Sequence, residues 1–495
     1  MTASQYLLSD QQMKQYLAAG CLPLKSSLPA EVHQRIYQRT DEVFAQSGNP
    51  GNNLLPFVPE IKKVFDDPVV VGALTSVLGP DYVMHSHRHP HINPIGSDGG
   101  GWHKDSYWGF RKVRSHRTRW AMIFYYPQDT SLENGPTAVM PGTHCFEKRA
   151  ASEAEEHHLP LVGEAGSMAL VHFDLWHRAM PNQADYTRYM MKFQFTRMQE
   201  PSAPTWNAQG GTWQPEDGSF MSARHWDWHC GGGIVGGDTV GEGNGRAVDA
   251  LAAELADEDP LVRLRASSAL GFKGAEATAA IEALAGALRD EKEPVRLNAA
   301  YALSAMGATA IAPLREALDD EMEEAQLAAA HGLAQAGSVA VPALLEALQS
   351  DGEPARGYAA FALGDMGSTA GDDAVQAVAR LAQDPSEWVR RSAVEALGTM
   401  ESSPQDAVPA LSTLLADEDG QTRYEAAYAL ARFGAQAADA VPALIAALND
   451  DDNRYVGAHS ATALRRIGTP EANGALLDYL SAARWCSMTT KESTF

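Results

Sequence analysis

Cysteine is scarce in this sequence, and its placement excludes two classes of protein. The 495 residues contain four cysteines, Cys21, Cys145, Cys230 and Cys486, and none of them stands in a Cys-x-x-Cys spacing. Scattered thiols favour neither a disulfide scaffold nor a zinc ribbon. We therefore expect a reducing compartment, of which the cytoplasm is the simplest.

Long apolar runs are also missing. No window approaches 18 uninterrupted apolar residues, and the opening MTASQYLLSDQQMKQYLAAG has no basic segment followed by an apolar core. We therefore expect neither a membrane span nor a signal peptide.

Positive charge is scarce relative to negative charge in the second half of the chain. Residues 1–245 hold 20 Lys and Arg against 25 Asp and Glu, whereas residues 246–495 hold 19 against 38. An acidic surface repels phosphate backbones and anionic lipid, so a nucleic acid or a membrane is not expected as a partner.

What the second half does contain is a repeat with intervals of 30 to 34 residues. Segments similar to VRLRASSALGFKG end at Gly274, Gly307, Gly337, Gly367, Glu401, Gly434 and Gly468. Seven copies at this period predict stacked pairs of helices. The second helix of a pair is represented by AVPALLEAL (340–348), AVPALSTLL (407–415) and AVPALIAAL (440–448), each with a proline near its start.

The repeat resembles HEAT-like repeats of the phycobilisome-lyase type. This resemblance implies an all-α solenoid, whose extended surface would dock a protein partner. A solenoid that serves only as a scaffold remains the alternative. Before the repeat, GGGIVGGDTVGEGNG has eight glycines in fifteen residues, which is typical of a flexible linker.

These features predict four parts along the chain. They are an N-terminal domain over residues 1–230, a glycine-rich linker over 231–246, the solenoid over 247–485 and a C-terminal tail over 486–495.

The N-terminal part begins with helical patterns and continues with short strands. Ser9 and Gln12 form a capping box before a helix that should end at Gly20, and two further helices are expected over 29–46 and 59–79. The expected strands are YVMHSHRHPHI (82–92), RWAMIFYYP (119–127), TAVMP (137–141), SMALVHFD (167–174) and RYMMKFQFTRM (188–198). This order predicts an α+β domain built on a β-sandwich or barrel.

The last of these strands has two different faces. One face carries Arg188, Met190, Lys192, Gln194 and Thr196, and the other carries Tyr189, Met191, Phe193 and Phe195. The apolar face can pack under helices, whereas the polar face must line solvent or a cavity. A barrel interior with charged groups is usually a functional pocket.

GGGWHKDSYW (99–108) contains a His-x-Asp triplet, His103 to Asp105. In a strand these two side chains project to the same side and can converge on one ion, with Lys104 pointing away. An imidazole and a carboxylate need a second histidine to complete a facial triad for ferrous iron. The triplet alone is weak evidence, because His172 to Asp174 and His225 to Asp227 repeat it.

Two later segments strengthen the case for His103. HRAMPNQADYTR (177–188) places His177 eleven residues before Arg188, and NGPTAVMPGTH (134–144) supplies a turn, a strand and a second turn between the triplet and His177. In this order and spacing, the three segments resemble the phytanoyl-CoA dioxygenase family of Fe(II)- and 2-oxoglutarate-dependent oxygenases. The resemblance covers about residues 5 to 200.

The resemblance implies the fold and the chemistry of the first domain. The fold would be a double-stranded β-helix, a jelly-roll or cupin-like barrel. His103, Asp105 and His177 would bind Fe(II), Arg188 would bind the distal carboxylate of 2-oxoglutarate, and O2 would be the other co-substrate. Asp105 favours hydroxylation over halogenation, because the halogenases of the family lack the carboxylate ligand. The substrate would be an unidentified small or carrier-bound molecule.

Several alternatives remain open on the sequence alone. The oxygenase fold could be inactive and act as an interaction scaffold, or the solenoid could act alone, as in a bilin lyase. A histidine row in HSHRHPH, made of His85, His87, His89 and His91, could contact substrate or lie on a partly solvated face. Pro90 suggests a sheet edge or a bulge there. Trp102 and Tyr107 could line the site or be core residues, and the aromatic segment 225–233 is expected to pack on the barrel or to cover its mouth.

Overall fold

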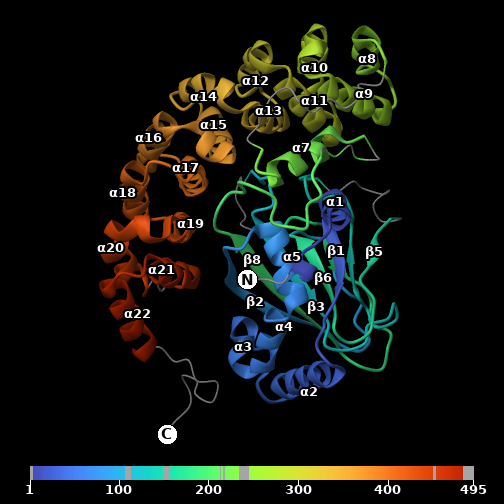
Figure 1. Ribbon diagram of the computed structural model, residues 1–495, viewed down its shortest axis with the longest axis vertical. Coiled ribbons are helices and arrows are strands. Elements are labelled where there is room, and N and C mark those ends of the chain that lie inside the picture. Colours follow the sequence, from blue (N-terminus) through green and yellow to red (C-terminus); the bar gives the residue numbers. More distant parts are fainter. Residues whose placement is uncertain are drawn as a thin grey trace. The chain divides into compact units, whose positions relative to one another are not determined.

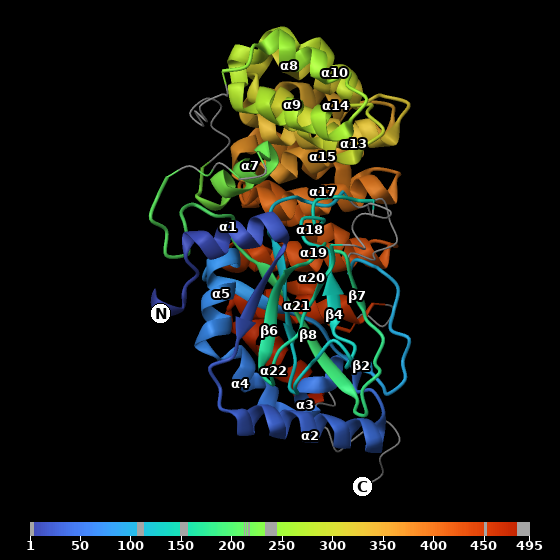
Figure 2. The same cartoon turned by 90° about the vertical axis from the view of Figure 1, so that its right-hand side faces the viewer.

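The computed structural model describes residues 4–105, 113–148, 157–211, 213, 215, 218–232, 245–449 and 453–482. These residues form two units that divide between Gly210 and Gly211. The described elements include strands in the first unit, whereas those of the second unit are all helices (Figures 1 and 2). The predicted tail and most of the predicted linker lie outside the described residues, and the domain boundaries stay predictions.

Short helices open the first unit. They are η1 (Ser4–Tyr6), α1 (Asp10–Ala19), α2 (Ala30–Ser47), η2 (Gly51–Asn53), α3 (Leu54–Phe57), η3 (Pro59–Ile61), α4 (Lys62–Phe65) and α5 (Pro68–Leu78). Helix α1 begins and ends as predicted. The Ser9 side chain accepts a hydrogen bond from the Gln12 amide, and Gly20 ends the helix in the left-handed region at φ 73°.

The single helix expected over residues 59–79 is wrong. The structure divides this stretch into η3, α4 and α5, with a break at Asp66 and Asp67. The residue before a proline is disfavoured in helical conformation, so Asp67 leaves the helix ahead of Pro68. The Asp67 side chain then accepts a hydrogen bond from the Val69 amide and caps α5.

Two antiparallel sheets carry the strands. A five-stranded sheet has the order β1-β6-β3-β8-β2, and a three-stranded sheet has the order β5-β4-β7. The strands are β1 (Cys21–Lys25), β2 (Tyr82–Asn93), β3 (Trp120–Tyr125), β4 (Thr137–Val139), β5 (Leu159–Pro160), β6 (Ser167–His172), β7 (His177–Ala179) and β8 (Arg188–Arg197). The five strands expected over 82–92, 119–127, 137–141, 167–174 and 188–198 are present as β2, β3, β4, β6 and β8. Strands β1, β5 and β7 lie outside these five segments.

Strand β8 lies inside the larger sheet, between β3 and β2, and all ten of its residues are buried. Its apolar face packs under helices, as predicted: the Phe193 ring lies 4.3 Å from Phe65 of α4, and the Tyr189 ring lies 5.1 Å from Phe44 of α2. Met190, on the other face, joins an apolar cluster drawn from both sheets. The cluster contains Cys21, Met122, Phe124, Tyr126, Val139, Leu161, Ala169, Val171, Phe173, Leu175 and Met190.

Strand β2 forms one edge of the larger sheet and is irregular. Its register against β8 shifts between Met84 and Arg88, and Pro90 lies on the regular part that follows. The predicted edge position of Pro90 is therefore confirmed, while the irregularity precedes the proline.

The second unit is a two-layer stack of helices, and Figure 1 shows it as a curve. One layer holds the seven predicted repeat segments: α9 (Pro260–Lys273), α11 (Glu293–Ala305), α13 (Glu323–Ala336), α15 (Glu353–Met366), α17 (Glu387–Met400), α19 (Gly420–Phe433) and α21 (Arg454–Ile467). The other holds α8 (Val248–Glu254), α10 (Ile281–Ala287), α12 (Ile311–Ala317), α14 (Val341–Ala347), α16 (Asp372–Arg380), α18 (Pro404–Leu414), α20 (Val441–Ala447) and α22 (Pro470–Ala482). The 3-10 segments η4 (Gly274–Ala280), η5 (Gly307–Ala310), η6 (Gly337–Ala340), η7 (Gly367–Ala370), η8 (Leu381–Gln383) and η9 (Gly434–Ala440) connect them.

One predicted helix start in the repeats is wrong. Pro342 and Pro442 stand in the first turns of α14 and α20, as expected, but Pro409 lies inside α18. Helix α18 begins earlier, at Pro404, because this second proline also supplies the fixed φ that suits a helix start.

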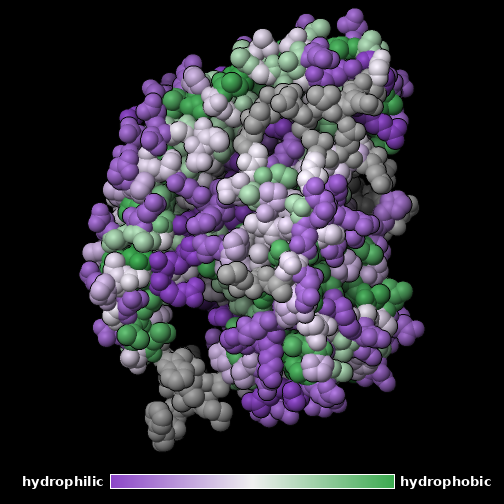
Figure 3. Space-filling model, viewed as in Figure 1, coloured by the Kyte–Doolittle hydropathy of each residue, from purple (hydrophilic) through white to green (hydrophobic). Residues whose placement is uncertain are grey.

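The stretch Glu323–Ala347 is long and apolar enough to cross a membrane by composition. However, 67% of its most apolar window is buried among the other repeats, as expected of a core helix. On the face shown in Figure 3, hydrophilic residues cover most of the repeats and hydrophobic residues are scattered among them.

The aromatic segment that was expected on the barrel packs on the repeats. It forms α7 (Phe220–His229), which belongs to the second unit and contacts α9 and α11. The Phe220 ring lies 5.1 Å from Phe272, and the His225 Nε2 lies 3.3 Å from the Tyr301 hydroxyl. The aromatic side chains of α7 therefore pack on the layer of repeat helices that holds α9 and α11.

Candidate metal centre

The glycine-rich segment 99–103 runs beside β7 and brings His103 opposite His177. The two residues exchange backbone hydrogen bonds, with the His103 amide 3.0 Å from the His177 carbonyl and the His177 amide 2.9 Å from the His103 carbonyl. Gly99 has φ 80°, and a Cβ there would lie 2.5 Å from the Ala179 carbonyl oxygen. Only glycine allows this close approach.

The strand predicted through His103 and Asp105 is wrong beyond its first residue. His103 forms an isolated bridge with His177, and Asp105 lies in a bend. The partner of Asp105 in a continued ladder would be Leu175, whose amide bonds instead to the His172 carbonyl in a turn. Because β7 begins only at His177, strand pairing cannot extend to Asp105. A bend in the backbone instead brings the Asp105 carboxylate to the two histidines.

Backbone carbonyls fix the orientation of both imidazoles. The His103 Nδ1 lies 3.0 Å from the Gly101 carbonyl oxygen, and the His177 Nδ1 lies 2.9 Å from the Leu175 carbonyl oxygen. A carbonyl only accepts hydrogen bonds, so Nδ1 carries the proton in each ring and Nε2 keeps its lone pair. Both histidines are therefore prepared to donate Nε2 to a cation.

Asp105 is almost fully buried, and its two oxygens have different surroundings. Oδ1 lies 2.5 Å from the Lys192 Nζ, and Oδ2 lies 3.7 Å from the His177 Nε2. Burial acts to raise the pKa of Asp105, but Lys192 and His177 outweigh it and hold the pKa below its ordinary value. Burial lowers the pKa of His177 to about 4. At neutral pH the carboxylate is charged and the imidazole of His177 is neutral, as metal ligation requires.

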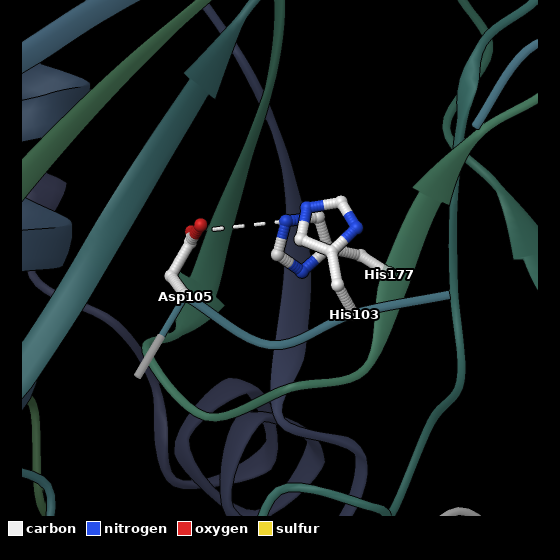
Figure 4. Close-up of side chains that lie close together, drawn as sticks. All are labelled: His103, Asp105 and His177. Carbon is white, nitrogen blue, oxygen red and sulfur yellow. Dashed lines mark ion pairs between the residues drawn. The ribbon is translucent and has the colours of Figure 1, made fainter. Parts of the chain in front are cut away.

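The three side chains form one group. One ligand atom from each of His103, Asp105 and His177 lies within 4.8 Å of the others, and Figure 4 shows them pointing toward one another. His103 is exposed, so the group is open on its side, while Asp105 and His177 are buried. Within the described residues, Asp105 Oδ2 has no hydrogen-bond partner. Two imidazole nitrogens and one unpartnered carboxylate oxygen fit an octahedral divalent ion with three open positions.

Arg188 lies at the start of β8, on the same face as Lys192. Its side chain is 1% exposed, and Nε donates a hydrogen bond to the Gly135 carbonyl at 2.9 Å. Nη1 has no hydrogen-bond partner in the described part of the chain. A buried guanidinium with a free donor can bind an incoming carboxylate.

The histidine row divides into two parts. His89 pairs across the strands with Lys192, and His91 pairs with Met190, so both face the side of β8 that carries Arg188 and Lys192. Burial, together with the nearby charges of Lys192 and Arg188, lowers the pKa of His91 well below its ordinary value. His85 precedes the shift in register, and its ring lies 5.1 Å from Trp120. His89 and His91 therefore line the interior near the triad as neutral groups.

The other predicted candidates that the structure describes contact side chains outside the triad. Asp174 bonds to the Nε of Arg114 at 3.0 Å, and Asp227 bonds to Arg224 at 3.1 Å on α7, so both repeated triplets have structural partners. The Trp102 ring lies under the Arg178 guanidinium at 4.8 Å. Tyr107 lies outside the described residues.

Sequence reasoning placed Lys192 on the polar face of β8 but gave it no role. Its ion pair with Asp105 joins residues 87 positions apart, across a bend that no spacing predicts. The available signal was its alternation with Arg188 on that face.

Comparison with protein families finds one family in the first part of the chain and another in the part that holds the repeat. Residues 8–190 match the family described as phytanoyl-CoA dioxygenase (PhyH). Residues 248–334, 341–430 and 408–485 match HEAT repeats. No curated protein matches the chain.

Several solved structures resemble part of the chain at low identity. EctD from S. alaskensis with 2-oxoglutarate and 5-hydroxyectoine is 16% identical over 41% of this chain and 84% of its own, with a TM-score of 0.35. The non-heme monooxygenase ThoJ in a nickel complex is 18% identical over 40% and 83%, with a TM-score of 0.32. The α-ketoglutarate-dependent carbocyclase SnoK from nogalamycin biosynthesis is 13% identical over 43% and 97%, with a TM-score of 0.33.

Proposed function

The chain joins a phytanoyl-CoA dioxygenase domain to HEAT repeats, and from this premise we propose that it is an Fe(II)- and 2-oxoglutarate-dependent dioxygenase that hydroxylates an organic substrate. The observation that carries the proposal is the convergence of two Nε2 atoms and one unpartnered carboxylate oxygen, from His103, His177 and Asp105. We further propose that the two sheets are the halves of a double-stranded β-helix, with this triad between them.

When bound, Fe(II) with O2 supplies the oxidation that converts 2-oxoglutarate to succinate and CO2 and a substrate C–H to C–OH. The chain's own residues position these partners. His103, Asp105 and His177 would hold the ion through two imidazole nitrogens and one carboxylate oxygen. The Arg188 Nη1 would receive the distal carboxylate, while the bond from Nε to the Gly135 carbonyl fixes the guanidinium. His89 and His91 line the wall near the triad without adding charge.

An inactive oxygenase fold that acts as a scaffold is the second candidate, with the solenoid as the working part. The intact triad and the unpartnered Arg188 donor favour the enzyme, since a scaffold needs neither. In either case, HEAT repeats suggest a protein partner, and we propose that the solenoid docks it. A cytoplasmic location, without nucleic acid or membrane as a partner, stays a prediction.

Binding measurements without turnover test the enzyme proposal. Full-length protein should bind Mn(II), and the Mn(II)-loaded protein should then bind 2-oxoglutarate. Arg188→Lys should weaken 2-oxoglutarate binding by about tenfold or more, because a single ammonium cannot both bond to the Gly135 carbonyl and present a donor where Nη1 lies, and should leave Mn(II) affinity unchanged. Calorimetric titration measures both constants.

Arg197→Lys is the matched control. Arg197 is also buried on β8, but it lies on the opposite face and donates to the Val77 carbonyl at 2.8 Å. It should retain both affinities. Wild-type protein that binds neither Mn(II) nor 2-oxoglutarate would favour the scaffold.

A further inference from the structure

One buried lysine outside the triad contacts one of the triad's residues. Lys192 lies in the middle of β8 with its side chain 3% exposed, and Nζ lies 2.5 Å from Asp105 Oδ1. Its backbone is held on both sides, since it pairs with Phe124 of β3 and with His89 of β2. The ammonium is thus fixed by the larger sheet, whereas Asp105 lies in a bend that the sheet does not hold.

This contact makes the two oxygens of Asp105 unequal. Oδ1 accepts the charge-assisted hydrogen bond from Lys192, and Oδ2 points toward the His177 Nε2 with no partner among the described residues (Figure 4). A carboxylate can bind a cation through one oxygen or through both. With Oδ1 engaged by an ammonium, only Oδ2 is free for a cation between Asp105 and the histidines.

The number of oxygens that Asp105 donates determines how many positions of an octahedral ion remain open. Two imidazoles and one carboxylate oxygen fill three positions, whereas two imidazoles and a chelating carboxylate fill four. 2-Oxoglutarate would take two positions and O2 one, so only the first arrangement can hold both.

We infer that Lys192 is a positioning residue that restricts Asp105 to one-oxygen ligation and thereby keeps the third position of the metal open. The inference rests on the proposed function, because it concerns the ion that the triad would hold. It adds a residue that belongs neither to the ligand set nor to the 2-oxoglutarate contact.

The test counts water on bound Mn(II) in the full-length protein without 2-oxoglutarate, by the water-proton relaxation enhancement per bound ion. Wild type should have three open positions filled by water. Lys192→Met keeps the apolar stem but removes the ammonium, so both oxygens of Asp105 become free to chelate. The inner-sphere enhancement should then fall by about one third.

Lys192→Arg retains a cation and should keep the wild-type enhancement. Gln194→Met is the matched control: Gln194 is equally buried, shares the face of Lys192 and receives the same new side chain. It should also match the wild type. Lys192→Leu, which is neutral, shorter and without a hydrogen-bond donor, replaces Lys192→Met if circular dichroism shows that the methionine variant does not fold.

The remaining outcomes contradict either the inference about Lys192 or the proposed function. A folded neutral variant with three waters, or one that no longer binds Mn(II), overturns the inference, because Lys192 would then not control the mode of ligation. Wild-type protein with two waters overturns it too. Wild-type protein that binds no Mn(II) instead contradicts the proposed function itself.

Discussion

At the scale of single residues, burial determines which groups are charged. Burial lowers the pKa of His177 to about 4, so its imidazole is neutral in the triad, and it lowers the pKa of His459 in α21 to about 3. The sequence could predict that the side chains of His103, Asp105 and His177 come together, because residue types and spacing carry that information. It could not give Lys192 its role or place Asp105 in a bend, since both depend on where the β7 ladder begins.

His459 should make the last repeats sensitive to acid. Its ring packs against Tyr424 at 4.9 Å and Tyr428 at 5.3 Å. Between pH 6.5 and pH 3 the unfolded imidazole binds a proton and the folded one does not, so stability is full above pH 6.5 and falls as pH decreases. The loss approaches about 1.4 kcal/mol per pH unit, and His459→Phe should remove it.

Hydrogen exchange of α21 at pH 7 and pH 5, corrected for intrinsic rates, measures this effect. His331→Phe is the control. Burial lowers the pKa of His331 to about 4, but it lies in α13, so this variant should change the pH dependence of α13 and not of α21. Equal pH dependence of α21 in wild type and His459→Phe would contradict the account.

At the scale of elements, caps and prolines explain most boundaries. The capping box of α1 could be read from Ser9 and Gln12, and the repeat helices from their period. The helix boundaries that were predicted wrongly lie where two sequence signals favour different boundaries. Asp67 and Pro68 divide an otherwise continuous helical pattern, and Pro404 starts α18 before Pro409.

A ladder of arginines and aspartates links successive repeats. Arg263, Arg356 and Arg390 each form two hydrogen bonds to an aspartate of the next repeat, Asp290, Asp384 and Asp417 respectively. The same arginines donate from Nη1 to carbonyls five or six residues earlier. Each arginine therefore hydrogen-bonds both to the loop before its own helix and to an aspartate of the next repeat.

Arg390→Gln should destabilise the repeats around α17 and α19 by about 2 kcal/mol, because both side chains of its ion pair with Asp417 are largely buried, at 9% and 8% exposed. Hydrogen exchange of these helices in the full chain measures the loss. Arg289→Gln removes an ion pair with Asp320 in which the arginine is 68% exposed, and it should have a much smaller effect. Equal losses of stability in the two variants would contradict the prediction that burial strengthens the ion pairs of the ladder.

At the scale of the whole molecule, the sequence predicts the helical repeats better than it predicts the sheets of the first unit. The repeats could be predicted nearly completely, because each one contacts only its neighbours and the period recurs seven times. The strands of the first unit could be located, but not their pairing. The sheet order β1-β6-β3-β8-β2 joins strands far apart in sequence, and β7, which carries His177, is three residues long. The packing of α7 on the repeats also required the structure.

The central claim is that His103, Asp105 and His177 hold the iron of a 2-oxoglutarate-dependent oxygenase. Succinate formation by the full-length protein with Fe(II), 2-oxoglutarate and O2, without added substrate, tests it most directly. Wild type should form succinate slowly, and Asp105→Ala should fall to the protein-free rate. Asp174→Ala, which removes the aspartate of a repeated triplet bonded to Arg114, should retain the wild-type rate. Equal succinate formation by wild type and Asp105→Ala, or none by wild type, would contradict the claim.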